Sequence, residues 1–363
     1  MNKKIIHPSL KSVKRPVPVK VVYSQYQKNN NRQIILFLLA SFFSILLFSY
    51  TPWLSQKGFP IIKAFSIFMG IFLQALPFLL LGILLSSAIQ IFLPDGFIEK
   101  FFSKNLMLSI LFGILGGLFL PVCDCVSIPV FRSLIKKGIP MPAAICFMTC
   151  SPIINPVVLL STYYAFGNSI TAVFYRTGTG ILCSLLISLT FLIKQPHSFF
   201  KENTNSLCFC NCGCNLENTT LFSLEEKIFA FFQHAKNEFY NVAKYLLIGI
   251  LISSIFQMTN MNILKSWGNE NIYKAVFAAI LLSFLLSLCS SSDAVIAKSL
   301  SVTFGSGTLL GFLVFGPMMD IKNILMLHGY FKKAFIIRLV VTIFFICYFV
   351  VIFANLVHGG IIL

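Results

Sequence analysis

The sequence predicts an all-α polytopic membrane protein whose chain falls into two similar halves. Of its 363 residues, 57% are hydrophobic and only 11% are charged, and the mean hydropathy is +0.86. Soluble domains carry roughly 25% charged residues, so this composition cannot cover a soluble surface of the required size. Apolar blocks long enough to cross a bilayer recur along the chain and predict about 8–10 transmembrane helices. A transmembrane barrel would show short alternating segments instead.

The N-terminal region is basic, and the first acidic residue of the chain is Asp95. Basic segments flank transmembrane helices mainly on the cytoplasmic side. Residues 1–32 are therefore expected to form a basic cytoplasmic arm of a protein in the bacterial cytoplasmic membrane. An extra N-terminal span is expected within residues 33–60. The net charge of +17 is explained by membrane orientation, and no nucleic-acid partner is expected.

The remaining apolar blocks form two predicted repeats, residues 61–193 and 236–363, joined by a cysteine-containing hydrophilic linker at 194–235. The blocks are 65–93, 106–120, 141–166 and 169–193 in the first repeat, and 242–256, 273–288, 309–328 and 334–357 in the second. Each repeat has an interruption, at residues 122–138 and 289–307, that is too polar for lipid-exposed helix. Such segments are tolerated at membrane depth where they line a cavity or pack inside protein, so each predicts a broken or re-entrant helix.

A single offset of 165 positions relates the two proline motifs that follow these interruptions. It places Pro152 on Pro317 and Asn155 on Asp320. Each proline frees a backbone carbonyl one turn earlier, so the polar residue that follows is expected to face a pocket. Paired interrupted helices in two halves indicate a binding site near the membrane midplane. The pattern leaves open whether the repeats are parallel or inverted.

Three acidic residues lie within these apolar or interrupted regions, namely Asp124, Asp293 and Asp320. A carboxylate at the bilayer centre costs roughly 2.5–3.5 kcal/mol on insertion scales, so all three are candidates for substrate or proton contact. Helix capping and structural ion pairs are the alternatives. The ion pairs considered are Asp124 with Arg132, and Asp293 or Asp320 with Lys298 or Lys322.

The serines of the two interruptions suggest helix N-termini that face each other. Ser290 can cap a short helix with Asp293 as its partner three residues on, and Asp124 with Ser127 can do the same in the first repeat. The free N–H groups and the positive end of the dipole would then make a polar pocket. Structural capping without any ligand explains the serines as well.

Cysteines flank this predicted pocket. Cys123 and Cys125 surround Asp124, and Cys289 begins the second motif. Thiolates suit soft centres such as Cu(I), zinc or trivalent arsenic, whereas an isolated buried cysteine is usually a small apolar residue. Cys146 and Cys150 share one helix face and are weaker candidates. Cys183 and Cys347 are assigned to packing.

A separate run in the linker holds Cys208, Cys210, Cys212 and Cys214 at alternate positions. The run fits capture of a soft metal or metalloid, or disulfides on an oxidising side of the membrane. Its spacing is not that of a zinc ribbon. A loop without an essential role is the alternative.

These motifs together resemble those of the predicted bacterial permeases of the organoarsenical-efflux (ArsP, YraQ-like) type. The matching segments are Pro121–Val130, Gly138–Pro140, Ser151–Pro156, Cys289–Ala294 and Phe315–Asn323. The sequence departs from the family pattern at Val126, where Gly is expected after Cys-Asp-Cys. The resemblance implies an inner-membrane permease with many spans. Some members export trivalent organoarsenicals and depend on cysteines.

The leading hypothesis is secondary efflux of a small soft or thiol-reactive solute, with trivalent organoarsenicals implied by the resemblance. The predicted substrate contacts are Cys123, Asp124, Cys125, Ser127, Asn155, Cys289, Ser290, Ser291, Ser292, Asp293 and Asp320. No nucleotide-binding loop occurs, so ATP-driven pumping by this chain alone is not expected. No cofactor and no enzymatic activity are expected. The expected partners are the lipid bilayer, a small-molecule or metalloid substrate and a coupling proton. The alternatives are a membrane thiol-disulfide oxidoreductase using Cys123 and Cys125, and a soft-metal-binding membrane accessory protein.

Overall fold

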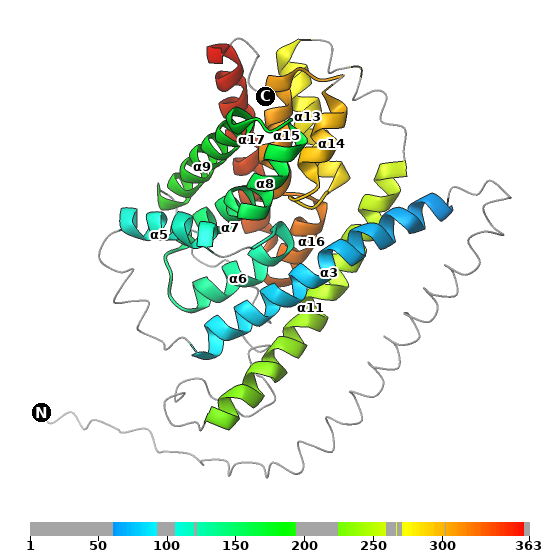
Figure 1. Cartoon of the computed structure of the whole chain (residues 1–363). Coiled ribbons are helices and arrows are strands. Elements are labelled where there is room, and N and C mark those ends of the chain that lie inside the picture. The colour runs from blue at the N-terminus through cyan, green and yellow to red at the C-terminus, as the bar shows by residue number, and fades with distance from the viewer. Residues whose placement is uncertain are drawn as a thin grey trace, which may run out of the picture. The chain divides into compact units, whose positions relative to one another are not determined.

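The computed structural model describes residues 61–92, 106–119, 122–193, 224–258, 266, 271–301 and 303–358. These residues are helical almost throughout, which confirms the all-α prediction (Figure 1). The helices are α3 (Ile61–Phe92), α5 (Leu106–Phe119), α6 (Asp124–Lys136), α7 (Met141–Ile154), α8 (Pro156–Ala165), α9 (Ile170–Ile193), α11 (Leu224–Met258), α13 (Ile272–Leu286), α14 (Asp293–Leu300), α15 (Ser306–Met318), α16 (Ile321–Tyr330) and α17 (Lys333–His358). The predicted N-terminal arm and first span lie outside the described residues.

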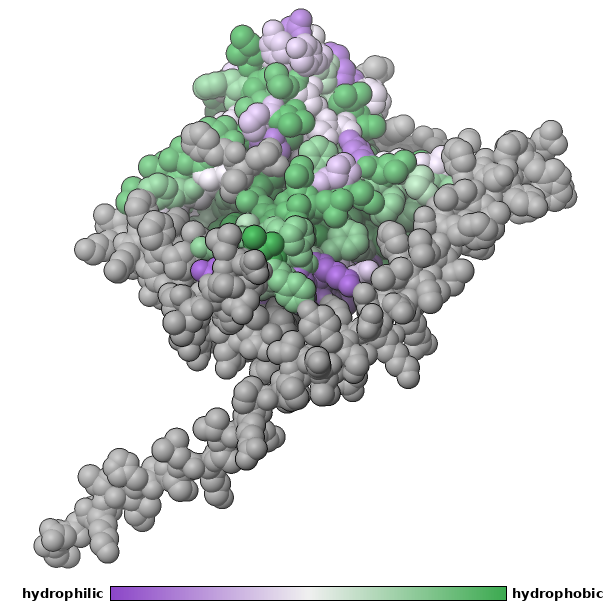
Figure 2. All heavy atoms as spheres, turned by 60° about the horizontal axis from the view of Figure 1, so that its bottom comes forward, coloured by the Kyte–Doolittle hydropathy of each residue, from purple (hydrophilic) through white to green (hydrophobic). Residues whose placement is uncertain are grey.

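Six segments of the described chain are long and apolar enough to cross a membrane: α3, α7 with α8, α9, α11, α15 with α16, and α17. The most apolar windows of α7–α8 and α15–α16 are 78% buried, against 22–39% in the other four. The two broken helices therefore form the centre of the described helices, and the continuous helices surround them. The face of the described residues that Figure 2 shows is largely apolar, as expected for a surface that contacts lipid.

The two broken helices match in length and in the position of their interruption. α7 begins at Met141 and α15 at Ser306, and α8 begins at Pro156 and α16 at Ile321, so both starts differ by the predicted 165 positions. The colour gradient of Figure 1 shows that α3 and α11 lie along each other and run in opposite directions. Contacts also cross between the halves, since α6 packs against α16 and α14 packs against α8.

The second half begins with a helix longer than the predicted block at 242–256. α11 is continuous from Leu224 to Met258, so it starts inside the predicted linker. No proline or glycine interrupts its first 25 residues, up to Gly249, which allows one helix to carry both polar and apolar stretches. Its polar residues are not all at a surface, because Glu238 is only 3% exposed.

α6 is short and is packed inside the protein rather than against lipid. Its first ten residues, Asp124–Ser133, are all buried. The helix lies against α3 at Gly82, where an added Cβ would overlap the side chain of Val126. The bulk of the Val126 side chain is thus accommodated by a glycine on the neighbouring helix.

Replacing Gly82 with Ala is expected to lower the free energy of unfolding by about 1–3 kcal/mol, because overpacking forces side chains or backbone to shift. The double variant Gly82→Ala/Val126→Gly should recover most of the loss. Gly70→Ala on the same helix is the control, since nothing lies within 4 Å of a Cβ added there. Thermal unfolding in detergent measures all three. A single Gly82→Ala variant as stable as the parent would contradict this packing.

Candidate functional site

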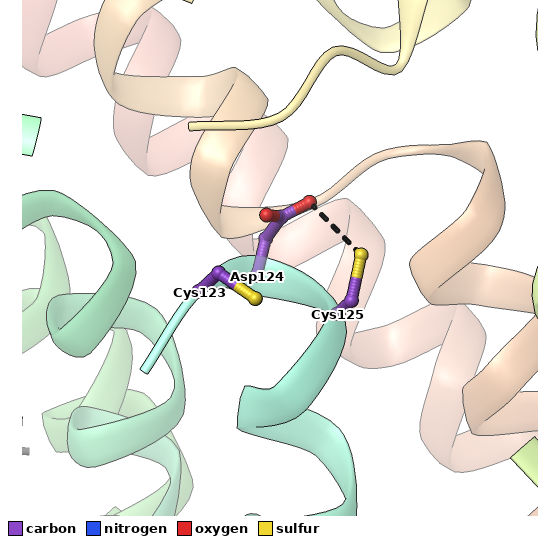
Figure 3. A group of neighbouring side chains, drawn as sticks. All are labelled: Cys123, Asp124 and Cys125. Carbon is purple, nitrogen blue, oxygen red and sulfur yellow. Dashed lines mark hydrogen bonds between the residues drawn. The ribbon is translucent and has the colours of Figure 1, made fainter. Parts of the chain in front are cut away.

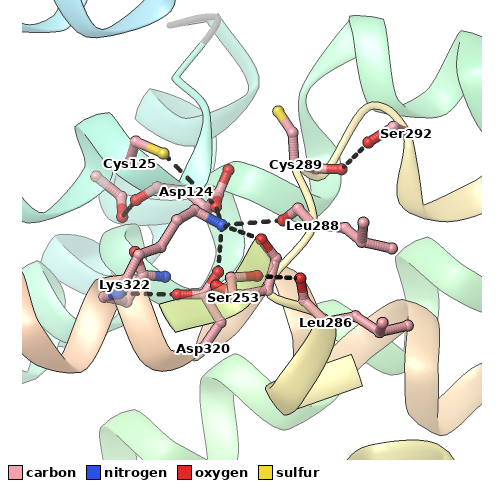
Figure 4. A network of polar contacts seen from close by, with 12 residues as sticks. Asp124, Cys125, Ser253, Leu286, Leu288, Cys289, Ser292, Asp320 and Lys322 are labelled. Carbon is pink, nitrogen blue, oxygen red and sulfur yellow. Dashed lines mark hydrogen bonds and ion pairs between the residues drawn. The ribbon is translucent and has the colours of Figure 1, made fainter. Parts of the chain in front are cut away.

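Lys322 of α16 lies at the centre of a buried polar network (Figure 4). Its Nζ is 2.7 Å from Oδ2 of Asp124 and also contacts Oδ2 of Asp320. The same ammonium donates to the carbonyls of Ser287, at 3.2 Å, and Leu288, at 3.0 Å. Asp124 and Asp320 are fully buried and Lys322 is 1% exposed. One cation therefore joins the polar motifs of both halves.

The backbone places the two carboxylates at helix N-termini. Asp124 is the first residue of α6, where the positive end of the helix dipole favours a negative charge. Asp320 caps α16, and its Oδ1 accepts a hydrogen bond of 2.8 Å from the backbone N–H of Asn323. Asn155 has the equivalent role in the first half, where it caps α8 by accepting from the N–H of Val157 at 3.0 Å.

The unwound segment between α13 and α14 supplies carbonyl oxygens to this network. α13 ends at Leu286, and the C-cap residue Ser287 has a left-handed backbone with φ of 47°. The carbonyl of Leu286 accepts from the side chains of Ser253 and Gln257 on α11. The next two carbonyls accept from Lys322. Carbonyls freed where the helix ends are thus paired inside the protein, as membrane depth requires.

A second buried ion pair joins Asp293 of α14 to Arg176 of α9. Oδ2 of Asp293 is 2.7 Å from Nη2 of Arg176, and Nη1 of Arg176 donates to Oγ1 of Thr162 on α8 at 2.7 Å. Arg176 is fully buried and Asp293 is 3% exposed. This pair fixes α14 against α8 and α9.

Some of the predicted ion pairs are wrong. Asp320 does pair with Lys322, as considered from the sequence. Asp124 does not pair with Arg132, however, because it contacts Lys322 from the other half. Asp293 pairs with Arg176 and not with Lys298 or Lys322.

The predicted serine caps are also wrong. α14 begins at Asp293 with Ser292 at its N-cap position, and Ser292 makes no capping hydrogen bond. Its hydroxyl instead donates to the carbonyl of Cys289 at 3.0 Å. In the first half, Cys123 is the N-cap of α6, and Ser127 donates to the carbonyl of Asp124 at 2.7 Å. Both hydroxyls thus satisfy nearby carbonyls and do not cap free N–H groups.

The serines beside Cys289 connect the unwound segment to other helices. Ser290 is 1% exposed. The hydroxyl of Ser291 accepts from Nε2 of Gln74 on α3 at 3.3 Å, and its carbonyl accepts from the hydroxyl of Ser161 on α8. Ser291 therefore links α3 and α8 to the second motif.

Two buried thiols flank Asp124 in the first motif. Donor atoms of Cys123, Asp124 and Cys125 all lie within 4.8 Å of one another (Figure 3). A third buried thiol, Cys289, belongs to the opposite motif (Figure 4). All three thiols are free, and Oδ1 of Asp124 has no hydrogen-bond partner. Thiols beside a carboxylate are a donor set that suits a soft metal or metalloid.

The other cysteines either lie apart from this group or fall outside the described residues. Cys146 and Cys150 are free and buried in α7, and Cys183 and Cys347 are buried in α9 and α17. The thiol of Cys347 contacts the sulfur of Met318 at 3.6 Å, as expected for a packing residue. The run from Cys208 to Cys214 lies outside the described residues.

Sequence reasoning missed Arg176 and Glu238, and it named Lys322 only as one possible partner of Asp293 or Asp320. The cost of a buried charge was considered for acidic residues alone. A basic residue inside an apolar block is just as costly, so the same argument applied to Arg176 and Lys322 would have found both. Glu238 was missed because it lies between the predicted linker, which ends at residue 235, and the apolar block that begins at residue 242.

Broken helices at the centre of a polytopic helical protein, with buried ion pairs where they meet, define a membrane protein of the transporter class. The comparison with known families agrees, and the chain belongs to the family described as predicted permease, whose model matches residues 61–358.

Two relatives extend over most of the chain. UPF0718 protein YcgR of Bacillus subtilis is 40% identical over 280 residues, which cover 77% of this chain and 92% of that protein. A putative two-component membrane permease complex subunit of Streptococcus mutans is 36% identical over 283 residues, covering 78% and 91%. UPF0718 protein YraQ of Escherichia coli is 27% identical over 108 residues, covering 30% and 31%. No solved structure matches the chain.

Proposed function

We propose that this permease is a secondary exporter of a small soft or thiol-reactive solute, with trivalent organoarsenicals as the substrate class. The observation that carries the proposal is the pair of buried thiols beside Asp124, where the donor atoms of Cys123, Asp124 and Cys125 lie within 4.8 Å of one another. Both thiols come from the first half, and the buried thiol of Cys289 from the second half would complete the site around a bound soft atom. Thiolate ligands favour such atoms over hard cations.

We further propose that the two halves are inverted repeats with the substrate site between them. The common offset of the broken helices and the opposite directions of α3 and α11 support this arrangement. In permeases built this way, rocking of one repeat against the other exposes the site to each side of the membrane in turn. The buried thiols belong to a closed conformation in such a cycle.

The alternative of a thiol-disulfide oxidoreductase is not favoured. Redox-active cysteines need an accessible thiolate, whereas Cys123 and Cys125 are 4% and 1% exposed. The remaining parts of the proposal concern the cell. The protein would lie in the cytoplasmic membrane with a cytoplasmic N-terminus. The name of the Streptococcus mutans relative suggests that a second subunit assembles with this chain.

Replacing Cys123, Cys125 or Cys289 with Ala should lower uptake of trivalent methyl and phenyl arsenicals into everted vesicles by about tenfold or more, since a lost contact worth 1.4 kcal/mol is a tenfold change. Cys183→Ala is the control, because its thiol packs in the apolar interior. Other metalloids and sulfur oxyanions complete the panel. If the parent protein accumulates no arsenical, the proposed substrate class is wrong. If the three variants match the control, the thiols are not the site.

A further inference from the structure

Glu238 of α11 is a buried carboxylate that takes no part in the site around Lys322. Its Oε2 accepts a hydrogen bond of 3.0 Å from the hydroxyl of Ser86 on α3, and it lies 3.6 Å from Nδ1 of His234. Its other oxygen, Oε1, is buried and has no hydrogen-bond partner. The Glu238 side chain is 2% exposed and that of His234 is 19% exposed. An ionised carboxylate in this position is costly unless a cation or several donors satisfy it.

Hydrogen bonds connect Glu238 to the helix that carries the thiols. The hydroxyl of Ser86 is 2.7 Å from that of Ser133 and 3.4 Å from the carbonyl of Pro129. Ser133 and Pro129 both belong to α6, whose first residue is Asp124. The charge of Glu238 decides whether Ser86 donates its proton to the carboxylate or to α6. The position of α6 can therefore respond to that charge.

The ionisable groups around Glu238 come from three helices. His234 lies on its own helix, α11. Arg132 and Lys136 act on it from α6, and Tyr330 acts from α16. The described residues of α3 that take part in this cluster are uncharged: Ser86, Ser87 and Gln90.

Arg132 and His234 differ in whether they can transfer a proton to Glu238. Arg132 stacks on the ring of Tyr330, with its Cζ 4.3 Å from the ring centroid, and its buried Nε has no hydrogen-bond partner. Arg132 adds positive charge to the surroundings of Glu238 but forms no ion pair with it. His234 is held by Ser87, 3.1 Å from Nδ1, and is partly exposed. A histidine at the edge of a buried cluster can relay protons between water and an interior carboxylate.

The other buried acids of the described chain are poor proton carriers by comparison. Asp124 and Asp320 share the ammonium of Lys322, and Asp293 holds the guanidinium of Arg176. A proton on any of these carboxylates would leave a buried cation with one partner fewer, which is unfavourable. A proton on Glu238 removes a buried charge, changes the hydrogen bond from Ser86 and the contact with His234, and weakens only the attraction of Arg132 and Lys136, which form no ion pair with it.

We infer that Glu238 is the proton-binding site that couples transport to the proton gradient, with His234 as its connection to water. In the binding step a proton from the aqueous phase passes through His234, and an O–H bond forms on the carboxylate. No electrons move, and release reverses the step. Loss of the negative charge frees the hydroxyl of Ser86 to donate to α6. The role of the bound proton in export rests on the proposed function, whereas proton binding itself does not.

Glu238→Gln tests the inference in reconstituted vesicles. The variant should lose the stimulation of arsenical transport by an imposed pH gradient and should retain exchange of bound for free substrate. Lys244→Gln is the control, because it removes a charge from the exposed side of α11 without touching the buried cluster. Survival of the pH stimulation in Glu238→Gln would overturn the inference. Loss of exchange as well, in folded protein, would show a structural role only and also overturn it.

A second readout needs no substrate and separates this inference from the proposed function. Infrared difference spectra between acidic and alkaline buffer should contain the C=O band of a protonated buried carboxyl in the parent. The band should be absent from Glu238→Gln and present in Lys244→Gln. Ser86→Ala keeps the acid but removes the hydroxyl that links it to Ser133 and Pro129 of α6, so it should retain the band and lose the pH stimulation. A band unchanged in Glu238→Gln would contradict proton binding at this residue even if no arsenical were transported.

Discussion

Lys322→Met is expected to lower the free energy of unfolding by about 3–5 kcal/mol, because removing one partner of a buried ion pair leaves an uncompensated charge. Here the loss falls on two carboxylates, since Lys322 contacts both Asp124 and Asp320. The carbonyls of Ser287 and Leu288 lose their donor as well. The thermal unfolding temperature in detergent, measured without substrate, should fall accordingly. The yield of folded protein should fall as well.

Two matched variants separate charge from packing in this network. Asp124→Asn should cost less than Lys322→Met, because the Lys322–Asp320 pair remains. The triple variant Lys322→Met/Asp124→Asn/Asp320→Asn should recover much of the stability, since no buried charge is left unpaired. If Lys322→Met unfolds at the temperature of the parent, the ion network does not form as described.

Arg176→Met is expected to cost a similar amount, about 3–5 kcal/mol, because it leaves Asp293 charged and buried with no cation. Together with Asp293→Asn and the double variant, this change makes a double-mutant cycle. The double variant should lose less stability than the sum of the two single changes, by roughly 0.5–3 kcal/mol for residues in direct contact. The measurement is unfolding by denaturant or heat in a detergent in which the parent unfolds reversibly.

Arg338→Met is the control for this cycle. Arg338 of α17 donates to the carbonyl of Thr190 and lies over the ring of Phe191, at 4.5 Å from the centroid. It is only partly buried, so its loss should cost less than that of Arg176. Strictly additive effects of Arg176→Met and Asp293→Asn would contradict the 2.7 Å contact between them.

The fold was largely predictable because its signals are local and periodic. Apolar block length gave the helices, and Pro152 and Pro317 marked the two broken ones at the right offset. The starts of α6 and α14 were less predictable, because Ser127 and Ser292 donate to carbonyls and do not cap helices. The start of α11 at Leu224 was not predictable, because the polar residues that precede its apolar block at 242–256 resemble a hydrophilic linker.

The candidate site was only half predictable, for a physical reason. The acids and thiols were found because their side chains are costly or reactive in a membrane. Their partners were not, because Asp124 and Lys322 are 198 positions apart and Arg176 and Asp293 are 117 apart. Nothing local in the sequence states which distant cation satisfies which acid. Packing of α6 against α16 and of α14 against α8 decides it.

The most direct test of the central claim is arsenic X-ray absorption of purified protein loaded with a trivalent phenylarsenical. The protein should carry serine at positions 208, 210, 212 and 214, so that the linker thiols cannot contribute. Arsenic–sulfur scattering is expected, and it should disappear when Cys123 and Cys125 are both replaced with Ala and persist when Cys183 is replaced. Scattering that persists without Cys123 and Cys125, or its absence from the parent, would contradict a substrate site at these buried thiols.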